Sequence, residues 1–278
     1  MKETKRTPYP ELDTVLETYA QQLQKVLGNN FVGMYVQGSL AVGDFDLSSD
    51  IDFIVVIKDD LTAKEVAEIQ DTHTHTYSQH NRWVKRFEYS FFPIHVFHQH
   101  SSPYTDGKPT ALQGRALWYF DNGSPTIERS DHCNTLVTRW TVREKGKTLL
   151  GPDPATLIEP IPADDLRTEI KETLIGWGHE LLANPASYRN RFYQSYLVLN
   201  YARMLHDLHA GKIRSKLAGM HWAKAHLDPQ WIDLIDFCWQ ERQDTLISVQ
   251  QPAHAEVFEQ SLAFVTYVVE LGKQYEIR

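Results

Sequence analysis

The sequence has 278 residues, 42% of them hydrophobic, which is enough for a sizeable core and favours two domains over one. Acidic residues outnumber basic residues by 36 to 28, a net charge of −8, which argues against a nucleic-acid partner because that surface needs clustered Lys and Arg. The two cysteines are not spaced as a zinc site, and no apolar run is long enough for a signal peptide or a membrane span, so we expect a cytoplasmic protein with no membrane contact.

The first half of the sequence predicts helices mixed with strands. Apolar residues from Leu12 to Leu27 recur at the three- and four-residue spacing of an amphipathic helix. Thr62 and Glu65 have the spacing of a capping box, which opens a second helix. Apolar and β-branched runs predict strands, which we place over residues 31–36, 51–57, 85–91, 94–98 and 117–120.

The second half predicts helices alone. A proline-rich segment over residues 151–163 is the best domain boundary, and we divide the chain into residues 1–155 and 156–278. Helical patterns with short loops follow over residues 164–183, 188–210, 215–227, 229–248 and 253–275. The fold class is therefore α+β, with a mixed sheet and its helices followed by an all-α helical bundle domain.

The stretch GSLAVGDFDLSSDIDF carries the strongest chemical pattern. Residues two apart on a strand point to the same face, so Asp50 and Asp52 project together, and a shared divalent cation would relieve their repulsion. Carboxylate oxygens favour Mg²⁺, which takes further ligands from substrate phosphates. Gly38 permits close approach of a backbone to a phosphate, and Ser39 adds a hydroxyl donor. A bare D-x-D more often caps a helix or lies in a turn, so the prediction depends on the combination.

That combination of a strand, Gly-Ser, about ten residues and Asp-Ile-Asp before an apolar strand resembles the signature of the nucleotidyltransferase superfamily related to DNA polymerase β. The stretch LLGPDPATLIEPIPADDLRTEIKETL and the later LNYARMLHDLHAGKIRSKLAGMHWA resemble the C-terminal helical domain of bacterial aminoglycoside 3''- and 9-adenylyltransferases. The resemblance covers most of the chain and is diffuse between about residues 81 and 130.

The resemblance implies roles for residues of the first domain. Asp50 and Asp52 would bind Mg²⁺, and Ser39 and Ser49 would position the phosphates of ATP. A third carboxylate is expected from a later strand, where Glu88 matches as a third metal ligand or as the general base. The alternative is an ordinary strand glutamate that faces solvent or pairs with Arg86.

In the second domain the resemblance implies that Arg203 and Lys216 contact the ATP phosphates and that Tyr267 contacts the nucleotide. The alternatives are a surface Arg, a surface Lys and a core Tyr. One position departs from the family, because the acidic residue that meets the cationic antibiotic in drug-modifying members is Tyr193 here. A family Trp that stacks on the drug is matched loosely by Trp118.

The function implied by the resemblance is Mg²⁺-dependent transfer of AMP from ATP to a hydroxyl of a small acceptor, with release of pyrophosphate. The expected acceptor is an aminoglycoside or aminocyclitol antibiotic of the streptomycin or spectinomycin type, and the expected state is a monomer. Two alternatives stay open: a nucleotidyltransferase that modifies a protein or tRNA, and a non-catalytic relative that only binds ATP.

Several histidines are grouped in the sequence in a way that suggests metal ligands; they are His73, His75, His80, His95, His98 and His100. Neither a neighbouring Cys nor a carboxylate at matching spacing accompanies them, so we do not expect a zinc site.

Overall fold

The computed structural model describes residues 7–79, 82–98, 104–105, 108–109 and 116–277. The chain divides into two compact units. The N-terminal unit comprises Met1–Phe45 and Ser49–Ile161, and the C-terminal unit comprises Asp46–Ser48 and Pro162–Arg278.

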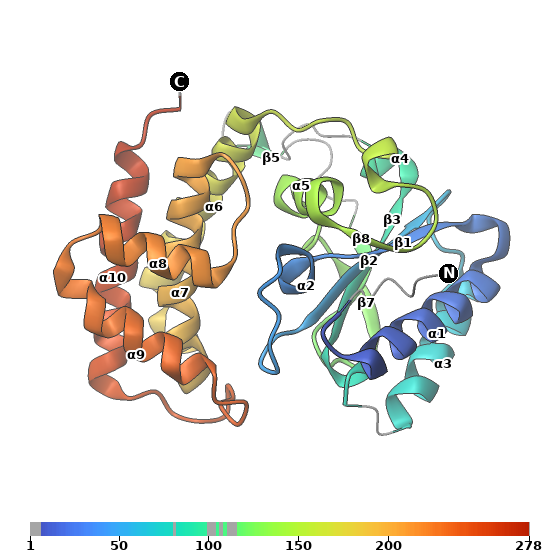
Figure 1. Ribbon diagram of the computed structural model, residues 1–278, viewed down its shortest axis with the longest axis horizontal. Helices are drawn as coiled ribbons and strands as arrows, with labels where there is room; N and C mark the ends of the chain where they lie inside the picture. The colour runs from blue at the N-terminus through green and yellow to red at the C-terminus, as the bar shows by residue number, and fades with distance from the viewer. Residues whose placement is uncertain (1–6, 80–81, 99–103, 106–107, 110–115, 278) are drawn as a thin grey trace. The chain divides into compact units, whose positions relative to one another are not determined.

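A mixed sheet of six strands forms the centre of the N-terminal unit (Figure 1). Its strands are β1 (Phe31–Val36), β2 (Ile51–Ile57), β3 (Phe87–Pro93), β6 (Leu117–Phe120), β7 (Ile127–Ser130) and β8 (Lys147–Leu150). They lie in the order β7-β6-β3-β2-β1-β8, and β2 and β3 are parallel whereas the other neighbours are antiparallel. A separate antiparallel pair consists of β4 (Tyr104–Thr105) and β5 (Lys108–Pro109).

Helices cover both faces of this sheet. They are α1 (Pro10–Leu27), α2 (Gly38–Val42), α3 (Ala63–Ser78), α4 (Ile94–Phe97) and α5 (Leu136–Lys145). Figure 1 shows α1 and α3 on one side of the sheet and α2 and α5 on the other. The predicted capping box is confirmed: Thr62 Oγ1 accepts from Glu65 N at 3.2 Å, and Glu65 Oε2 accepts from Thr62 N at 2.8 Å.

The alternation along β2 determines which face carries the polar residues. Ile51, Phe53 and Val55 are buried in the core that α1 and α3 share with the sheet. Ile54 and Val56 are also buried but point to the opposite face. Asp52 therefore lies on the face that α2 and α5 cover.

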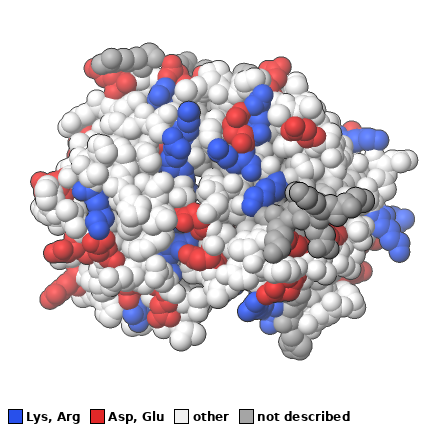
Figure 2. All heavy atoms as spheres, viewed as in Figure 1, with Lys and Arg blue, Asp and Glu red and all other residues white. Residues whose placement is uncertain are grey.

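The C-terminal unit is helical. Its helices are α6 (Ala163–Ala183), α7 (Arg191–Ala210), α8 (Lys216–His226), α9 (Ile232–Arg242) and α10 (Ala255–Gln274). α7 packs against α6, α8, α9 and α10, so its side chains are buried on several sides. Within the described part of the chain, no helix has the length and apolar character needed to cross a membrane. On the face drawn in Figure 2, acidic and basic side chains are interspersed.

Several local predictions were wrong or incomplete. Residues 94–98 were expected to be a strand, but Ile94–Phe97 is a short helix, because so short a stretch of Ile, His, Val and Phe fits either period. β3 begins at Phe87 rather than at residue 85, after a 3₁₀ turn over Val84–Arg86. The one-turn helix α2 and the two edge strands of the sheet, β7 and β8, were not predicted.

Candidate active site

The first feature of the site is the start of β2. Asp50 precedes the strand and Asp52 is its second residue, between the buried Ile51 and Phe53. The Asn122 amide donates from Nδ2 to Asp50 Oδ1 at 2.5 Å. The main chain of Asp52 accepts from Gln37 N at 2.9 Å, which joins the start of β2 to the residue before α2.

Gly38 lies directly beside the Asp52 carboxylate, and Ser39 follows it in α2. Gly38 has a φ of +58°, and a Cβ added there would lie 1.9 Å from Asp52 Oδ2. Only glycine fits, because any side chain would overlap the carboxylate. The buried Ser39 Oγ has no hydrogen-bond partner among the residues that the structure describes, and Ser49, just before Asp50, is 5% exposed.

The third predicted carboxylate lies next to Asp52. In the parallel register of β2 and β3, Asp52 is opposite Glu88, and neighbouring strands are about 4.8 Å apart. The Glu88 side chain is 15% exposed. The structure therefore places Asp52 and Glu88 side by side on one face of the sheet.

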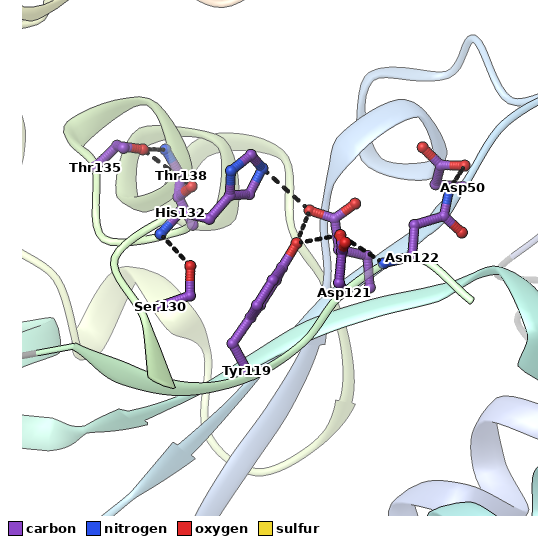
Figure 3. Close-up of polar contacts among 9 residues, drawn as sticks. Asp50, Tyr119, Asp121, Asn122, Ser130, His132, Thr135 and Thr138 are labelled. Carbon is purple, nitrogen blue, oxygen red and sulfur yellow. Dashed lines mark hydrogen bonds and ion pairs between the residues drawn. The ribbon is translucent and has the colours of Figure 1, made fainter. Parts of the chain in front are cut away.

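Glu88 belongs to a hydrogen-bond network with Tyr119 and His132, and Figure 3 shows these two residues near Asp121, Asn122 and Asp50. Tyr119 of β6 donates its hydroxyl proton toward Glu88 Oε1 at 3.0 Å and Asp121 Oδ1 at 2.9 Å. His132, in the loop before α5, places Nε2 at 3.2 Å from Glu88 Oε1. Asp121 Oδ1 also accepts from the backbone N of Asn122 at 2.9 Å, so the network continues to Asp50.

Charge in this network affects the protonation of two of its members. The hydrogen bond to Glu88 raises the pKa of His132, and the nearby Asp121 and Asp52 charges act in the same direction. Burial and the Glu88 charge raise the pKa of the Tyr119 hydroxyl, which is therefore a proton donor at any physiological pH.

The carboxylates have the hard oxygen donors that Mg²⁺ prefers, and Asp52 and Glu88 lie on one face of the sheet, so the donor chemistry fits a divalent cation. Within the described ranges, no group of three or more His, Cys, Asp or Glu side chains has the arrangement of a formed metal site. In the structure these carboxylates contact other side chains of the protein. Asp50 accepts a hydrogen bond from Asn122, and Glu88 contacts Tyr119 and His132.

In the C-terminal unit, Arg203 and Lys216 lie on neighbouring helices. Arg203 of α7 donates from Nη2 to Asn200 Oδ1 at 2.7 Å. Lys216 is the first residue of α8, and its Nζ lies 4.7 Å from the centre of the Tyr196 ring. The two helices approach closely, because a Cβ at Gly219 would lie 2.6 Å from Arg203 Cα.

A buried carboxylate lies between these two residues in the chain. Asp207 is 3% exposed, its Oδ2 lies 4.0 Å from Arg203 Nε, and its Oδ1 accepts from Arg214 N at 2.8 Å. Burial raises the pKa of Asp207 to about 7, although Arg203 and Arg214 oppose the shift. Asp207 thus contacts both the predicted phosphate-binding Arg203 and the loop that leads to Lys216.

Three other expected positions have different surroundings. Tyr267 of α10 accepts from Asp228 N at 3.4 Å through its hydroxyl. Tyr193, in the first turn of α7, packs in an aromatic cluster with Tyr188 at 5.0 Å between ring centres. Trp118 of β6 lies under the guanidinium of Arg129, at 4.1 Å.

The histidines have separate roles. His73 is buried in the core of the N-terminal unit, and His75 contacts Gln79 on the exposed side of α3. His98 Nδ1 faces the carbonyl oxygen of Leu157 at 3.1 Å. His80 and His100 lie outside the described residues.

The sequence patterns did not indicate Tyr119, Asp121, Asn122 or His132 as site residues. Asp121-Asn122-Gly123 was visible only as a turn after a predicted strand. The pairing of β3 with β6, which sets Ser90 opposite Tyr119, brings these residues to Glu88 and has no local sequence signal.

Comparisons with known proteins show what the whole chain is similar to. Residues 156–270 match the family model described as the C-terminal domain of aminoglycoside adenylyltransferase. Spectinomycin 9-adenylyltransferases of Staphylococcus aureus, including those of strains Mu50 and N315, are 26% identical over 223 residues, which cover 77% of this chain and 78% of theirs.

A solved structure, that of spectinomycin adenyltransferase AAD(9) from Enterococcus faecialis with ATP and spectinomycin, matches with a TM-score of 0.67. The match covers 94% of this chain and 99% of that chain at 18% identity, and it shows that the fold is shared. Together, the comparisons show that residues 156–270 resemble the C-terminal domain of aminoglycoside adenylyltransferase and that most of the chain is similar in sequence and fold to spectinomycin adenylyltransferases.

Proposed function

We propose that this protein transfers AMP from ATP to a hydroxyl of an aminocyclitol or aminoglycoside antibiotic, with spectinomycin as the first candidate, and releases pyrophosphate. The relatives named as spectinomycin 9-adenylyltransferases support the acceptor class. The neighbour solved with ATP and spectinomycin supports ATP as the co-substrate.

One observation carries the proposal. Asp52 and Glu88 lie opposite each other on adjacent parallel strands, beside a glycine whose missing side chain leaves space only for the Asp52 carboxylate. A buried Ser39 hydroxyl with no partner in the described chain adjoins this glycine. Two adjacent carboxylates and a hydroxyl without a hydrogen-bond partner suit a site that binds a phosphate chain and accepts a proton.

Each residue of the N-terminal unit then has a distinct role. Asp50 and Asp52, with Glu88 as a possible third ligand, would hold Mg²⁺, which neutralises phosphate charge and orients the triphosphate for in-line displacement. Gly38, Ser39 and Ser49 bind the phosphates. Glu88 takes the proton of the acceptor hydroxyl.

The C-terminal unit supplies cations and the nucleotide contact in this proposal. Arg203 and Lys216 bind the triphosphate, where cationic donors stabilise the negative charge of the leaving pyrophosphate. Tyr267 contacts the nucleotide. The proposed domains are residues 1–155 for nucleotidyl transfer and residues 156–278 for the helical part.

The acceptor-binding residues differ from the pattern of the family. Tyr193 replaces an acidic residue, and Arg189 nearby pairs with Glu259 at 2.5 Å. This position is therefore aromatic where the family is acidic, and Glu259 pairs with the Arg189 charge, which favours an acceptor with fewer cationic groups than a typical aminoglycoside.

Pyrophosphate release tests the proposal. The protein, ATP and MgCl₂ are incubated with each member of an antibiotic panel that includes spectinomycin and streptomycin. Turnover with at least one drug is expected, and Asp52→Asn should lower it by roughly a thousandfold or more because charge stabilisation dominates this chemistry. Wild-type turnover by Asp52→Asn would show that the metal assignment is wrong.

A further inference from the structure

The two oxygens of Glu88 have unequal surroundings. Tyr119 Oη at 3.0 Å and His132 Nε2 at 3.2 Å both contact Oε1. Among the described residues, the hydrogen bond and the ion pair of Glu88 both involve Oε1 rather than Oε2. The carboxylate is thus held by one oxygen from two directions.

We propose that Tyr119 and His132 are positioning residues that hold Glu88 through Oε1, so that Oε2 is the atom that accepts the proton of the acceptor hydroxyl. The inference rests on the proposed function. In the step, the acceptor O–H bond breaks and its proton forms a bond to Oε2. The acceptor oxygen bonds to the α-phosphorus, and the bond from the α-phosphorus to the bridging oxygen breaks, so pyrophosphate leaves with the electron pair.

The Tyr119 hydroxyl that contacts Glu88 is held in place by the sheet and by a second carboxylate. Tyr119 is fixed by the pairing of β6 with β3, where it is opposite Ser90, two residues beyond Glu88. Its hydroxyl proton is shared with Asp121 Oδ1 at 2.9 Å, so the hydroxyl also separates two carboxylates that would otherwise repel each other. A base held in one orientation loses little freedom when the acceptor arrives.

The contact between His132 and Glu88 contributes little to the packing of the fold. Its side chain is 66% exposed and it lies in a loop, so it contributes little buried area to the fold. Glu88 is the acidic partner of this exposed side chain, at 3.2 Å. Removal of the imidazole should therefore affect Glu88 far more than the stability of the unit.

The test compares kcat and KM of five single variants, one of which is Glu88→Gln, with ATP, MgCl₂ and spectinomycin. Tyr119→Phe removes only a hydroxyl, and His132→Leu removes the N–H donor whereas His132→Gln retains one. Tyr35→Phe is the matched control, because this buried tyrosine donates to the carbonyl oxygen of Pro152 at 2.9 Å and not to a carboxylate.

Tyr119→Phe and His132→Leu should each lower kcat about 10- to 100-fold, the effect of losing a hydrogen bond to a charged group, with KM for both substrates within about twofold. His132→Gln should recover most of the rate, and Tyr35→Phe should keep kcat. Unchanged kcat in both Tyr119→Phe and His132→Leu, with activity abolished in Glu88→Gln, would overturn the positioning role and leave the base assignment intact.

Wild-type kcat in Glu88→Gln would instead overturn the proposed role of Glu88 itself. If neither spectinomycin nor streptomycin is turned over, crystal structures of the wild type and of the Tyr119→Phe/His132→Leu double variant still decide the inference. Glu88 should have one carboxylate orientation in the wild type and a shifted or multiple orientation in the double variant. An identical orientation in both would contradict it.

Discussion

At the scale of single residues, Gly38 determines how closely the backbone before α2 approaches Asp52. Its φ of +58° lies in the left-handed region, and an added Cβ would overlap the Asp52 carboxylate. Gly43, at the other end of α2, has a φ of +84° but open space around its Cα. Both glycines therefore have a positive φ, but only Gly38 lies against a residue of the proposed site.

Gly38→Ala and Gly43→Ala therefore separate backbone strain from damage to the site. Each should cost about 1 kcal/mol of stability because alanine is disfavoured at positive φ. Gly38→Ala should also lower kcat with ATP and spectinomycin at least tenfold, because the Asp52 carboxylate must move. Thermal unfolding and steady-state kinetics measure the two effects, and equal activities of the two variants would show that the close approach is not needed.

At the scale of secondary-structure elements, His73 joins α3 to the loop that carries part of the site. Its Nε2 lies 3.2 Å from the carbonyl oxygen of Ser124, so Nε2 carries the proton and Nδ1 is the acceptor. Nδ1 lies 3.2 Å from Tyr19 Oη and 3.1 Å from Tyr89 Oη. The loop between β6 and β7, which contains Ser124, also contains Asn122, the partner of Asp50.

The burial of His73 predicts a pH dependence of stability. Burial lowers the pKa of His73 from 6.5 to about 4, so the unfolded chain binds a proton that the folded chain excludes. Stability is lost as the pH falls below the unfolded value, and the contribution of His73 between pH 7 and pH 5 is about 2 kcal/mol.

His73→Gln should remove this part of the pH dependence, whereas the exposed His75→Gln on the same helix should not. Urea unfolding of the three proteins at pH 7 and pH 5 measures it. If His73→Gln loses as much stability on acidification as the wild type, the lowered pKa is contradicted.

Some secondary-structure elements could be predicted from the sequence and others could not. The strands at residues 31–36 and 51–57 and the helix after Thr62 were predictable because hydrophobic alternation and a capping box are local signals. Asp50, Asp52 and Gly38 could be proposed as site residues because one short stretch carries all three, and their roles stay predictions. His132 was not, because it reaches Glu88 only after strands distant in sequence have paired.

At the scale of the whole molecule, the proposed chemistry divides between the two units. The N-terminal unit contributes carboxylates and the small residues beside them, whereas the C-terminal unit contributes Arg203 and Lys216. The net charge of −8 and the interspersed charges of Figure 2 are consistent with a small acceptor rather than a nucleic acid. Cytoplasmic location and the monomeric state stay predictions.

The most direct test of AMP transfer is mass spectrometry of the antibiotic itself. Spectinomycin is incubated with ATP, MgCl₂ and either the wild type or Glu88→Gln. The account predicts a product that carries one adenylyl group with the wild type and a strongly reduced amount with Glu88→Gln. Unmodified spectinomycin and streptomycin in the presence of the wild-type protein, under conditions where ATP binds, would contradict the proposed acceptor class.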